Sequence, residues 1–160
     1  MTDPVDRRKA RAAAWFHSLR DQIVAAFEEL ETRFGDGARF EVNPTTRADG
    51  GGGLMSVLRG GKVFEKVGVN WSEVHGTLGD KAQRAMAARG VPGMAEDPRF
   101  WASGISLVAH MMNPHAPAVH MNTRMFWTPG ASWFGGGADL NPCIEYADDT
   151  GHFHAEMQRA

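Results

Sequence analysis

The amino-acid sequence predicts an α+β domain in which one long helix lies on a β-sheet. Apolar residues recur every three or four positions over the first part of the chain, which is the spacing of one helix face. Later runs rich in β-branched and aromatic residues are separated by glycine and proline turns, which is typical of strands. The chain has 160 residues, so residues 1–160 are expected to form a single domain with its own core.

The composition is that of a soluble globular protein, with 42% hydrophobic and 22% charged residues. A net charge of −2 argues against a nucleic-acid partner. Cys143 is the only cysteine, which excludes an intrachain disulfide and a cysteine-based metal site. The N-terminus lacks the apolar segment of a secretion signal, and no apolar run has membrane-spanning length. We therefore expect a cytoplasmic protein with no integral membrane segment.

The first element is an amphipathic helix that begins after Asp3 and ends at Gly35. Asp3-Pro4 is typical of a helix start, because aspartate caps free N–H groups and proline fits the first helical position. Gly35 interrupts the periodic pattern. We expect a helix of about eight turns whose apolar face lies on a sheet. That face would carry Phe16, Leu19, Ile23, Phe27, Leu30 and Phe34.

A short strand and a glycine-rich loop are expected next. Ala38–Asn43 is the strand candidate, and Pro44–Gly53 is expected to be a flexible turn at the border of a ligand site. A phosphate-binding loop is excluded, because the Gly-Lys-Ser/Thr order of that motif and its following helix are absent. Gly60-Gly61 then predicts a β-hairpin between Leu54–Arg59 and Lys62–Asn70.

The segments on either side of the central strands are less regular. Trp71–His75 is expected to be a third extended segment, and Asp80–Gly90 either a short helix capped by Asp80 or a loop. Pro92–Pro98 is expected to be a turn region. The segment Asp148–Ala160 starts with capping residues and is expected to be helical.

The central strands are expected at Trp101–Met111 and Val119–Trp127, joined by the proline-rich loop Asn113–Pro117. Side chains alternate between the two faces of a strand, so each strand has an apolar and a polar face. The apolar face would carry Ile105, Leu107, Ala109, Val119, Met121 and Met125. The polar face would carry Ser106, His110, His120, Asn122 and Arg124, which indicates a binding surface unless this face is only solvated.

An aromatic pair, three glycines and an aspartate follow these strands. Trp133-Phe134 precedes Gly135–Gly137, whose bare backbone allows close approach and is expected to give Asp139 an unusual backbone setting. Arginine binds carboxylates bidentately through its planar guanidinium group. The combination suggests a flat apolar ligand that carries carboxylates at its rim.

Five stretches of the chain carry a specific pattern, namely "GGGG" at 50–53, "VLRGGKVFEKVGVNWSEVHG" at 57–76, "GISLVAHMMNPHAPAVHMNTR" at 104–124, "WFGGGADLNP" at 133–142 and "HFH" at 152–154. In these stretches the sequence resembles the oxygen-dependent coproporphyrinogen III oxidase family. The family pattern usually has other residues at four positions, which here are Met111, His115, Ser132 and Asn141.

The resemblance covers the N-terminal half of the family, whose chains run to roughly twice this length. The end at Gln158-Arg159-Ala160, with no C-cap, agrees with a chain truncated at the C-terminus, so a partial domain that is inactive by itself is expected. The resemblance implies a large flat antiparallel β-sheet flanked by helices, in a homodimer. It also implies oxidative decarboxylation of two propionates of coproporphyrinogen III to vinyl groups, giving protoporphyrinogen IX, with molecular oxygen as co-substrate and no organic cofactor.

The resemblance also assigns roles to residues of the polar face. Asp139 would accept hydrogen bonds from pyrrole N–H groups, although an Asx turn would also explain an aspartate after glycines. His120 would donate a proton, since imidazole titrates near neutrality. The substrate would be bound by Ser106, Asn122, the Thr123 backbone and Arg124, the last of which could alternatively form a surface ion pair.

A metal site is a further expectation from the resemblance. His110, His120 and His154 match positions proposed as metal ligands in bacterial members, and three imidazoles could hold a divalent ion such as manganese. Histidines at a carboxylate-binding face also need no metal to explain them. Two other functions stay open, namely a metal-dependent oxygenase that uses two histidines and Asp139, and a non-catalytic module that binds tetrapyrroles or anions.

Overall fold

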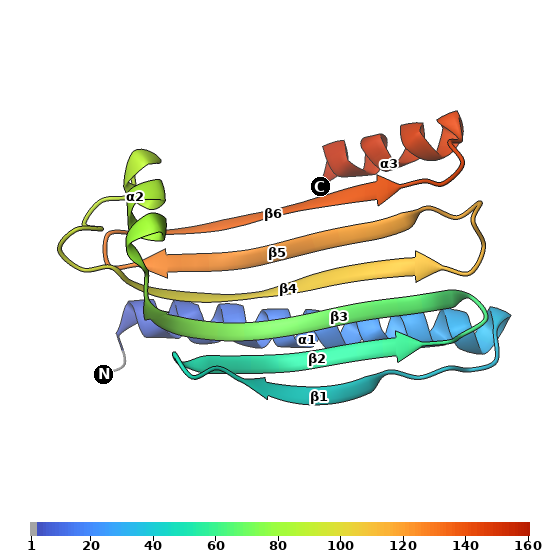
Figure 1. Ribbon diagram of the computed structural model, residues 1–160, viewed down its shortest axis with the longest axis horizontal. Coiled ribbons are helices and arrows are strands. Elements are labelled where there is room, and N and C mark those ends of the chain that lie inside the picture. Colours follow the sequence, from blue (N-terminus) through green and yellow to red (C-terminus); the bar gives the residue numbers. More distant parts are fainter. Residues whose placement is uncertain (1–2) are drawn as a thin grey trace.

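The computed structural model describes residues 3–160 and shows an α+β fold. Six strands form one sheet in the order β1-β2-β3-β4-β5-β6, and each strand is antiparallel to its neighbours (Figure 1). The strands are β1 (Glu41–Thr46), β2 (Gly51–Arg59), β3 (Phe64–Thr77), β4 (Arg99–Met111), β5 (Ala118–Thr128) and β6 (Ala131–Asn141). The helices are α1 (Pro4–Phe34), α2 (Asp80–Ala88) and α3 (Ala147–Arg159). The predicted fold class and antiparallel sheet are confirmed.

Helix α1 has the predicted ends. The Asp3 carboxylate accepts a hydrogen bond from the Val5 N–H at 2.9 Å, Pro4 occupies the first turn, and Gly35 is the C-cap. Within the described residues, no helix combines the length and the apolar character needed to cross a membrane.

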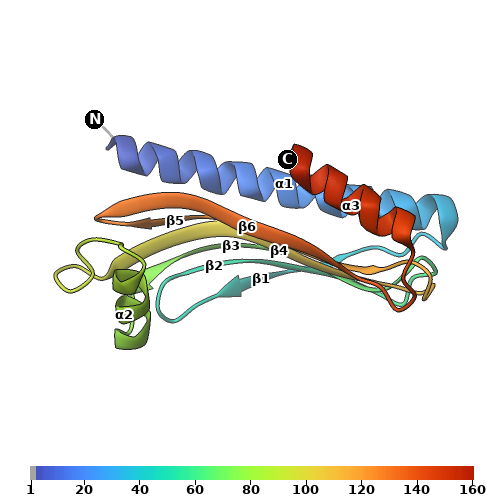
Figure 2. The same ribbon diagram turned by 90° about the horizontal axis from the view of Figure 1, so that it is seen from above.

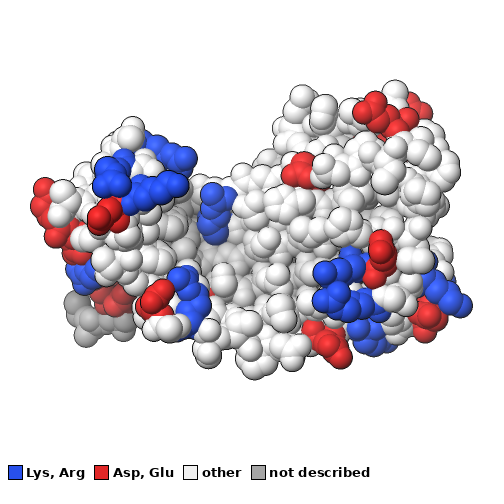
Figure 3. All heavy atoms as spheres, viewed as in Figure 1, with Lys and Arg blue, Asp and Glu red and all other residues white. Residues whose placement is uncertain are grey.

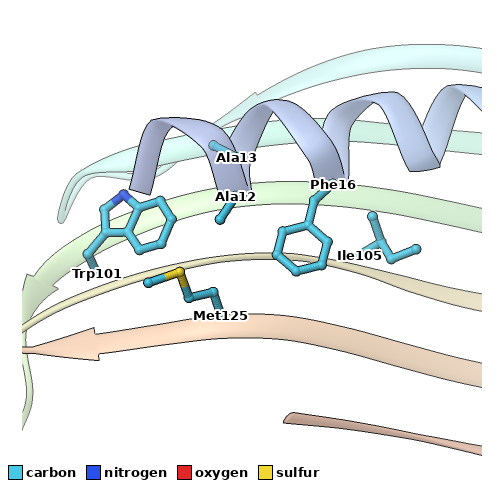
Figure 4. Packing of buried hydrophobic residues seen from close by; sticks show 6 residues of the cluster. All are labelled: Ala12, Ala13, Phe16, Trp101, Ile105 and Met125. Carbon is cyan, nitrogen blue, oxygen red and sulfur yellow. The ribbon is translucent and has the colours of Figure 1, made fainter. Parts of the chain in front are cut away.

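Helices α1 and α3 lie on one side of the sheet and α2 lies on the other side (Figure 2). Part of the core consists of α1 residues packed on β4 and β5, namely Ala12, Ala13 and Phe16 against Trp101, Ile105 and Met125 (Figure 4). A second cluster comes from β2, β3 and the other end of β4 and contains Leu58, Phe64, Val67, Val69, Leu107 and Ala109, with Ile23, Val24 and Phe27 of α1 packed against it. The predicted apolar faces are therefore confirmed over most of their length.

The last turns of α1 depart from the predicted pattern. Leu30 is 38% exposed and Phe34 is 66% exposed, so the sheet does not cover these two side chains fully. Glu31, by contrast, is fully buried. Its carboxylate accepts hydrogen bonds from three consecutive backbone N–H groups in the β2–β3 turn, at Lys62 (3.2 Å), Val63 (3.0 Å) and Phe64 (2.8 Å). This buried carboxylate fixes the end of α1 to the sheet.

The predicted hairpin at Gly60-Gly61 is confirmed, although its turn is longer than two residues, because β3 begins at Phe64. Gly60 has a φ of 63°, which favours glycine. A Cβ on Gly61 would collide with the Glu31 carboxylate. The segment Trp71–His75 is extended, as predicted, but it continues β3 and is not a third, separate piece.

The first strand and the glycine run were also predicted at the wrong positions. Strand β1 is shifted to Glu41–Thr46 and passes through Pro44, which an edge strand tolerates because the missing N–H can face outward. Gly51–Gly53 belong to β2 and do not form a flexible loop. A Cβ on any of them would collide with the backbone of β1 or β3, so these glycines allow close strand packing.

The open alternative for residues 80–90 is decided in favour of a helix. Helix α2 has Gly79 as its N-cap, so Asp80 lies in the first turn and is not the cap. Pro92–Pro98 contains only turns and irregular backbone, as predicted.

Candidate functional site

The sheet register gathers polar residues on the face that α1 does not cover, which we call the open face. Ser106 pairs with Asn122, and His120 pairs with Asp139. Directly paired residues point to the same face, and Ile105 and Met125, which contact α1, alternate with these positions. The predicted common face is therefore confirmed for Ser106, His110, His120, Asn122 and Arg124, and Asp139 lies on the same face.

Thr123 is the exception among the proposed substrate-binding residues. It pairs with Ile105, so its side chain points to the α1 side of the sheet. Only its backbone lies between Asn122 and Arg124, and substrate binding through this backbone stays a prediction.

A chain of hydrogen bonds joins His120, Asp139 and Asn141 on the open face. His120 Nδ1 lies 3.0 Å from Asp139 Oδ2, and the Asn141 side-chain amide donates to Asp139 Oδ1 at 2.5 Å. These bonds favour the charged carboxylate, and the bond to His120 has the larger effect, so the pKa of Asp139 is lowered from its ordinary value. Asp139 is therefore an anion at neutral pH. About half of its side chain, 53%, remains exposed and can receive further donors.

Arg124 has a neutral partner on its own strand. Its guanidinium donates to Asn122 Oδ1 at 2.7 Å. Of the ion pairs found among the described residues, none includes Arg124, so the structure does not support the alternative of a surface ion pair. Arg124 is exposed, so its guanidinium remains accessible to an incoming carboxylate.

Glycines of β6 leave a bare strip of backbone beside these residues. Gly135 pairs with Arg124 and Gly137 pairs with Asn122 on the open face, and a Cβ on Gly137 would meet open space. Neither glycine has a positive φ, and Asp139 continues a regular strand. The predicted unusual backbone setting of Asp139 was therefore wrong, and the Asx-turn alternative is excluded. Gly136 points to the other face, where a Cβ would collide with the Asn122 carbonyl.

The predicted aromatic pair is divided between the two faces. Phe134 lies on the α1 side, with its ring 6.5 Å from that of Phe16, whereas Trp133 lies on the open face. Trp133 stacks on Phe126 at 5.1 Å, and Phe126 stacks on Phe100 at 5.6 Å with nearly parallel planes. The middle ring of this row, Phe126, is two residues from Arg124 along β5. Alternation along one strand can predict the side on which Phe126 lies, but the contact with Phe100 depends on the register.

The site is a shallow depression in the sheet. A hollow of about 220 Å³ is lined in part by Asn70, Ser72, Gly104, Ser106 and Arg124. Asn70 and Ser72 come from β3 and were missed from the sequence, because only strand pairing brings them beside Ser106. Figure 3 shows this face, on which charged side chains are sparse over the middle and gather toward the ends. The surface combines a few donors with an otherwise uncharged floor.

Known proteins are similar in sequence to most of this chain. The family model for coproporphyrinogen III oxidase matches residues 11–160. The chain belongs to the coproporphyrinogen III oxidase family. It is 45% identical over 153 residues to an oxygen-dependent coproporphyrinogen-III oxidase of Rickettsia bellii (strain RML369-C), covering 92% of this chain and 52% of the relative. It is 41% identical over 157 residues to that of Rickettsia peacockii, covering 95% of this chain and 54% of the relative.

The chain thus spans about half the length of the curated relatives that it matches. The open face, with its polar residues, lies within the part of the family that this chain contains.

The histidines that family resemblance links to a metal are not gathered in one place. His110 and His120 lie on the open face, whereas His154 lies on α3, on the α1 side of the sheet (Figure 2). Among residues 3–160, no group of three or more His, Cys, Asp or Glu side chains is arranged to hold a metal ion. The side chains present therefore fit neither the three-histidine site nor a site of two histidines and Asp139. Manganese binding stays a prediction, and no step of the chemistry is derived from it.

His154 lies near Asp139, although it does not form a metal site with the other two histidines. It lines a hollow of about 250 Å³ between β6 and α3, to which Asp139 and Leu140 also contribute. Helix α3 therefore borders the strand that carries Asp139.

Proposed function

We propose that the open face is the site where this family member binds coproporphyrinogen III and oxidatively decarboxylates two propionates, giving protoporphyrinogen IX. The observation that carries the proposal is the position of one cation, Arg124, and one anion, Asp139, on the same uncharged floor. A tetrapyrrole with acidic side chains has anionic groups at its rim and N–H donors at its centre, so it needs both kinds of partner.

Arg124 and its neighbours would hold a propionate. Asn122 accepts from the guanidinium and so orients it, while Ser106, directly across from Asn122, offers a hydroxyl. Glycines at the paired positions on β4 and β6 keep the floor beside Arg124 free of side chains. A flat ring can then approach the backbone while its carboxylate contacts the guanidinium.

Asp139 would accept hydrogen bonds from the pyrrole N–H groups, because it is ionised and half exposed. Its negative charge would favour an electron-rich pyrrole, the form that reacts with an oxidant. His120, bonded to the same carboxylate, would supply a proton as oxygen is reduced.

The reaction balances without an organic cofactor. Each propionate loses CO₂, one proton and two electrons as the vinyl double bond forms. Molecular oxygen takes up the two electrons and two protons and becomes hydrogen peroxide. The net reaction consumes one proton per propionate, which is the role proposed for His120. For the whole protein, the homodimer remains part of this proposal.

An aerobic assay tests the function. The protein encoded by the natural reading frame that contains residues 1–160 is incubated with coproporphyrinogen III. Porphyrins are then identified by fluorescence and mass after oxidation. We expect loss of two CO₂ per macrocycle and formation of two peroxides, with Asp139→Asn as the inactive comparison. Coproporphyrin binding without turnover would favour the non-catalytic module. Turnover of a non-porphyrin substrate with stoichiometric iron would favour the oxygenase.

A further inference from the structure

Each charged residue of the site is bonded to an asparagine two positions along its own strand. On β5, Asn122 accepts a hydrogen bond from Arg124, and on β6 the side-chain amide of Asn141 donates one to Asp139. Residues two apart share a face of a strand, so both bonds form without a bend in the backbone. Asparagine can serve both charges because its amide contains an acceptor and two donors. The sequence had suggested a role for Asn122 but none for Asn141.

The bond from Asn141 complements the one from His120. His120 Nδ1 contacts Oδ2 of Asp139, whereas Asn141 contacts Oδ1, so the two partners hold different oxygens of the carboxylate. One partner alone would leave the carboxylate free to rotate away, because its side chain is 53% exposed. A carboxylate has about four acceptor positions, so one position remains on each oxygen.

We propose that Asn141 is a positioning residue that holds the Asp139 side chain in one rotamer and leaves one acceptor position on each oxygen for N–H groups of a ligand. That these N–H groups belong to pyrroles rests on the proposed function. Asn141 acts only through Asp139 and contacts no reacting atom.

Nuclear magnetic resonance measures the rotamer directly. The three-bond Hα–Hβ couplings of Asp139 are recorded in the wild type, in Asn141→Ala, in Asn141→Thr and in the matched control Asn43→Ala. Asn43 lies exposed on β1, on the same face of the sheet but far from β6 in strand order. We expect couplings of a single rotamer in the wild type and control, and averaged couplings in Asn141→Ala. Asn141→Thr should retain the single rotamer, since its hydroxyl is also a donor.

The proposal is overturned if the wild type already shows averaged couplings, or if Asn141→Ala keeps those of the wild type. This measurement needs no turnover, so it decides the role of Asn141 even if the proposed function fails.

Kinetics supply the second readout. In the active protein, Asn141→Ala should lower kcat roughly tenfold, the range for one hydrogen bond to a charged group, while KM changes by less than about twofold. Asn141→Thr should restore most of kcat. A rise in KM with unchanged kcat would show that Asn141 affects binding and does not position Asp139 for the reaction.

Discussion

The two faces of the sheet are built from the same strands but have different roles. On the α1 side, Ile105 and Met125 are each only 3% exposed and belong to the core. One residue along each strand, Ser106 and Arg124 point to the open face and are exposed. A shift of the register by one residue would exchange the two sets. The comparison teaches that stability and binding are encoded at alternate positions, so substitutions on one face should leave the property of the other face unchanged.

The largest effect is expected from the face covered by α1. Phe16 is 2% exposed in the main cluster, so Phe16→Ala should lower the free energy of unfolding by about 3–5 kcal/mol. The matched control is Phe34→Ala on the same helix, which should cost less than about 0.5 kcal/mol because Phe34 is 66% exposed. Urea unfolding measures both variants. Equal losses would mean that α1 does not pack as described.

The next largest effect is expected from Asp139→Asn on the open face. The substitution keeps the shape and removes the charge, so kcat should fall about a hundredfold or more, whereas KM and the urea midpoint should hardly change. Steady-state kinetics together with unfolding curves check this. Wild-type kcat would show that the anion is not needed for the reaction.

A smaller effect is expected from Arg124→Ala, which should mainly weaken binding. Loss of a charge-assisted hydrogen bond to a propionate costs about 2–3 kcal/mol, or roughly 30- to 150-fold in Kd. Fluorescence titration with coproporphyrin III measures it, with Arg59→Ala at the exposed end of β2 as control. If kcat is abolished while binding stays intact, the roles of Arg124 and Asp139 are assigned to the wrong residues.

The smallest effect is a pH dependence of stability that Asp139 causes. Its folded pKa lies below the ordinary value of 3.8, so the charged form is stabilised by folding. This contribution is present above the ordinary pKa and is lost as the pH falls through the lower folded value. The wild type should therefore lose slightly more stability than Asp139→Asn between about pH 4 and that value. Acid titrations of both proteins, followed by circular dichroism, measure this difference. Equal loss of stability in the two proteins would contradict the prediction.

The covered face was the easier of the two to predict from the sequence. The helical periodicity up to Phe27 and the alternation around Ile105 both follow from the need to bury apolar area, whereas Leu30 and Phe34 continue the pattern without being buried. Glu31 was missed because its three partners lie in a turn about thirty residues away, and a charged residue in a helix usually faces water. The glycines of β2 were taken for a loop, because only the neighbouring backbone explains why no side chain fits there.

For the open face, the sequence predicted which side chains share a face within each strand, but it did not predict the contacts between strands. Alternation alone places His120 and Arg124 on the polar face of one strand and Ser106 on the polar face of the other, and the pairing of the two strands makes these one face. The bond from Asn141 to Asp139 also lies within one strand, but a strand asparagine gives no sign of its partner. The row of Phe100, Phe126 and Trp133 depends on a register that only the folded sheet defines.

The central claim is that the tetrapyrrole binds on the open face, and two adjacent residues test it most directly. Val108 is 39% exposed on the open face, opposite His120, whereas Leu107 is 6% exposed beneath α1. Methyl resonances of both are followed as coproporphyrin III is added, since the macrocycle's ring current shifts nearby methyl groups. We predict large shifts for Val108 and much smaller shifts for Leu107, both reduced in Arg124→Ala. Larger shifts for Leu107, or saturable binding that leaves Val108 unmoved, would contradict the account.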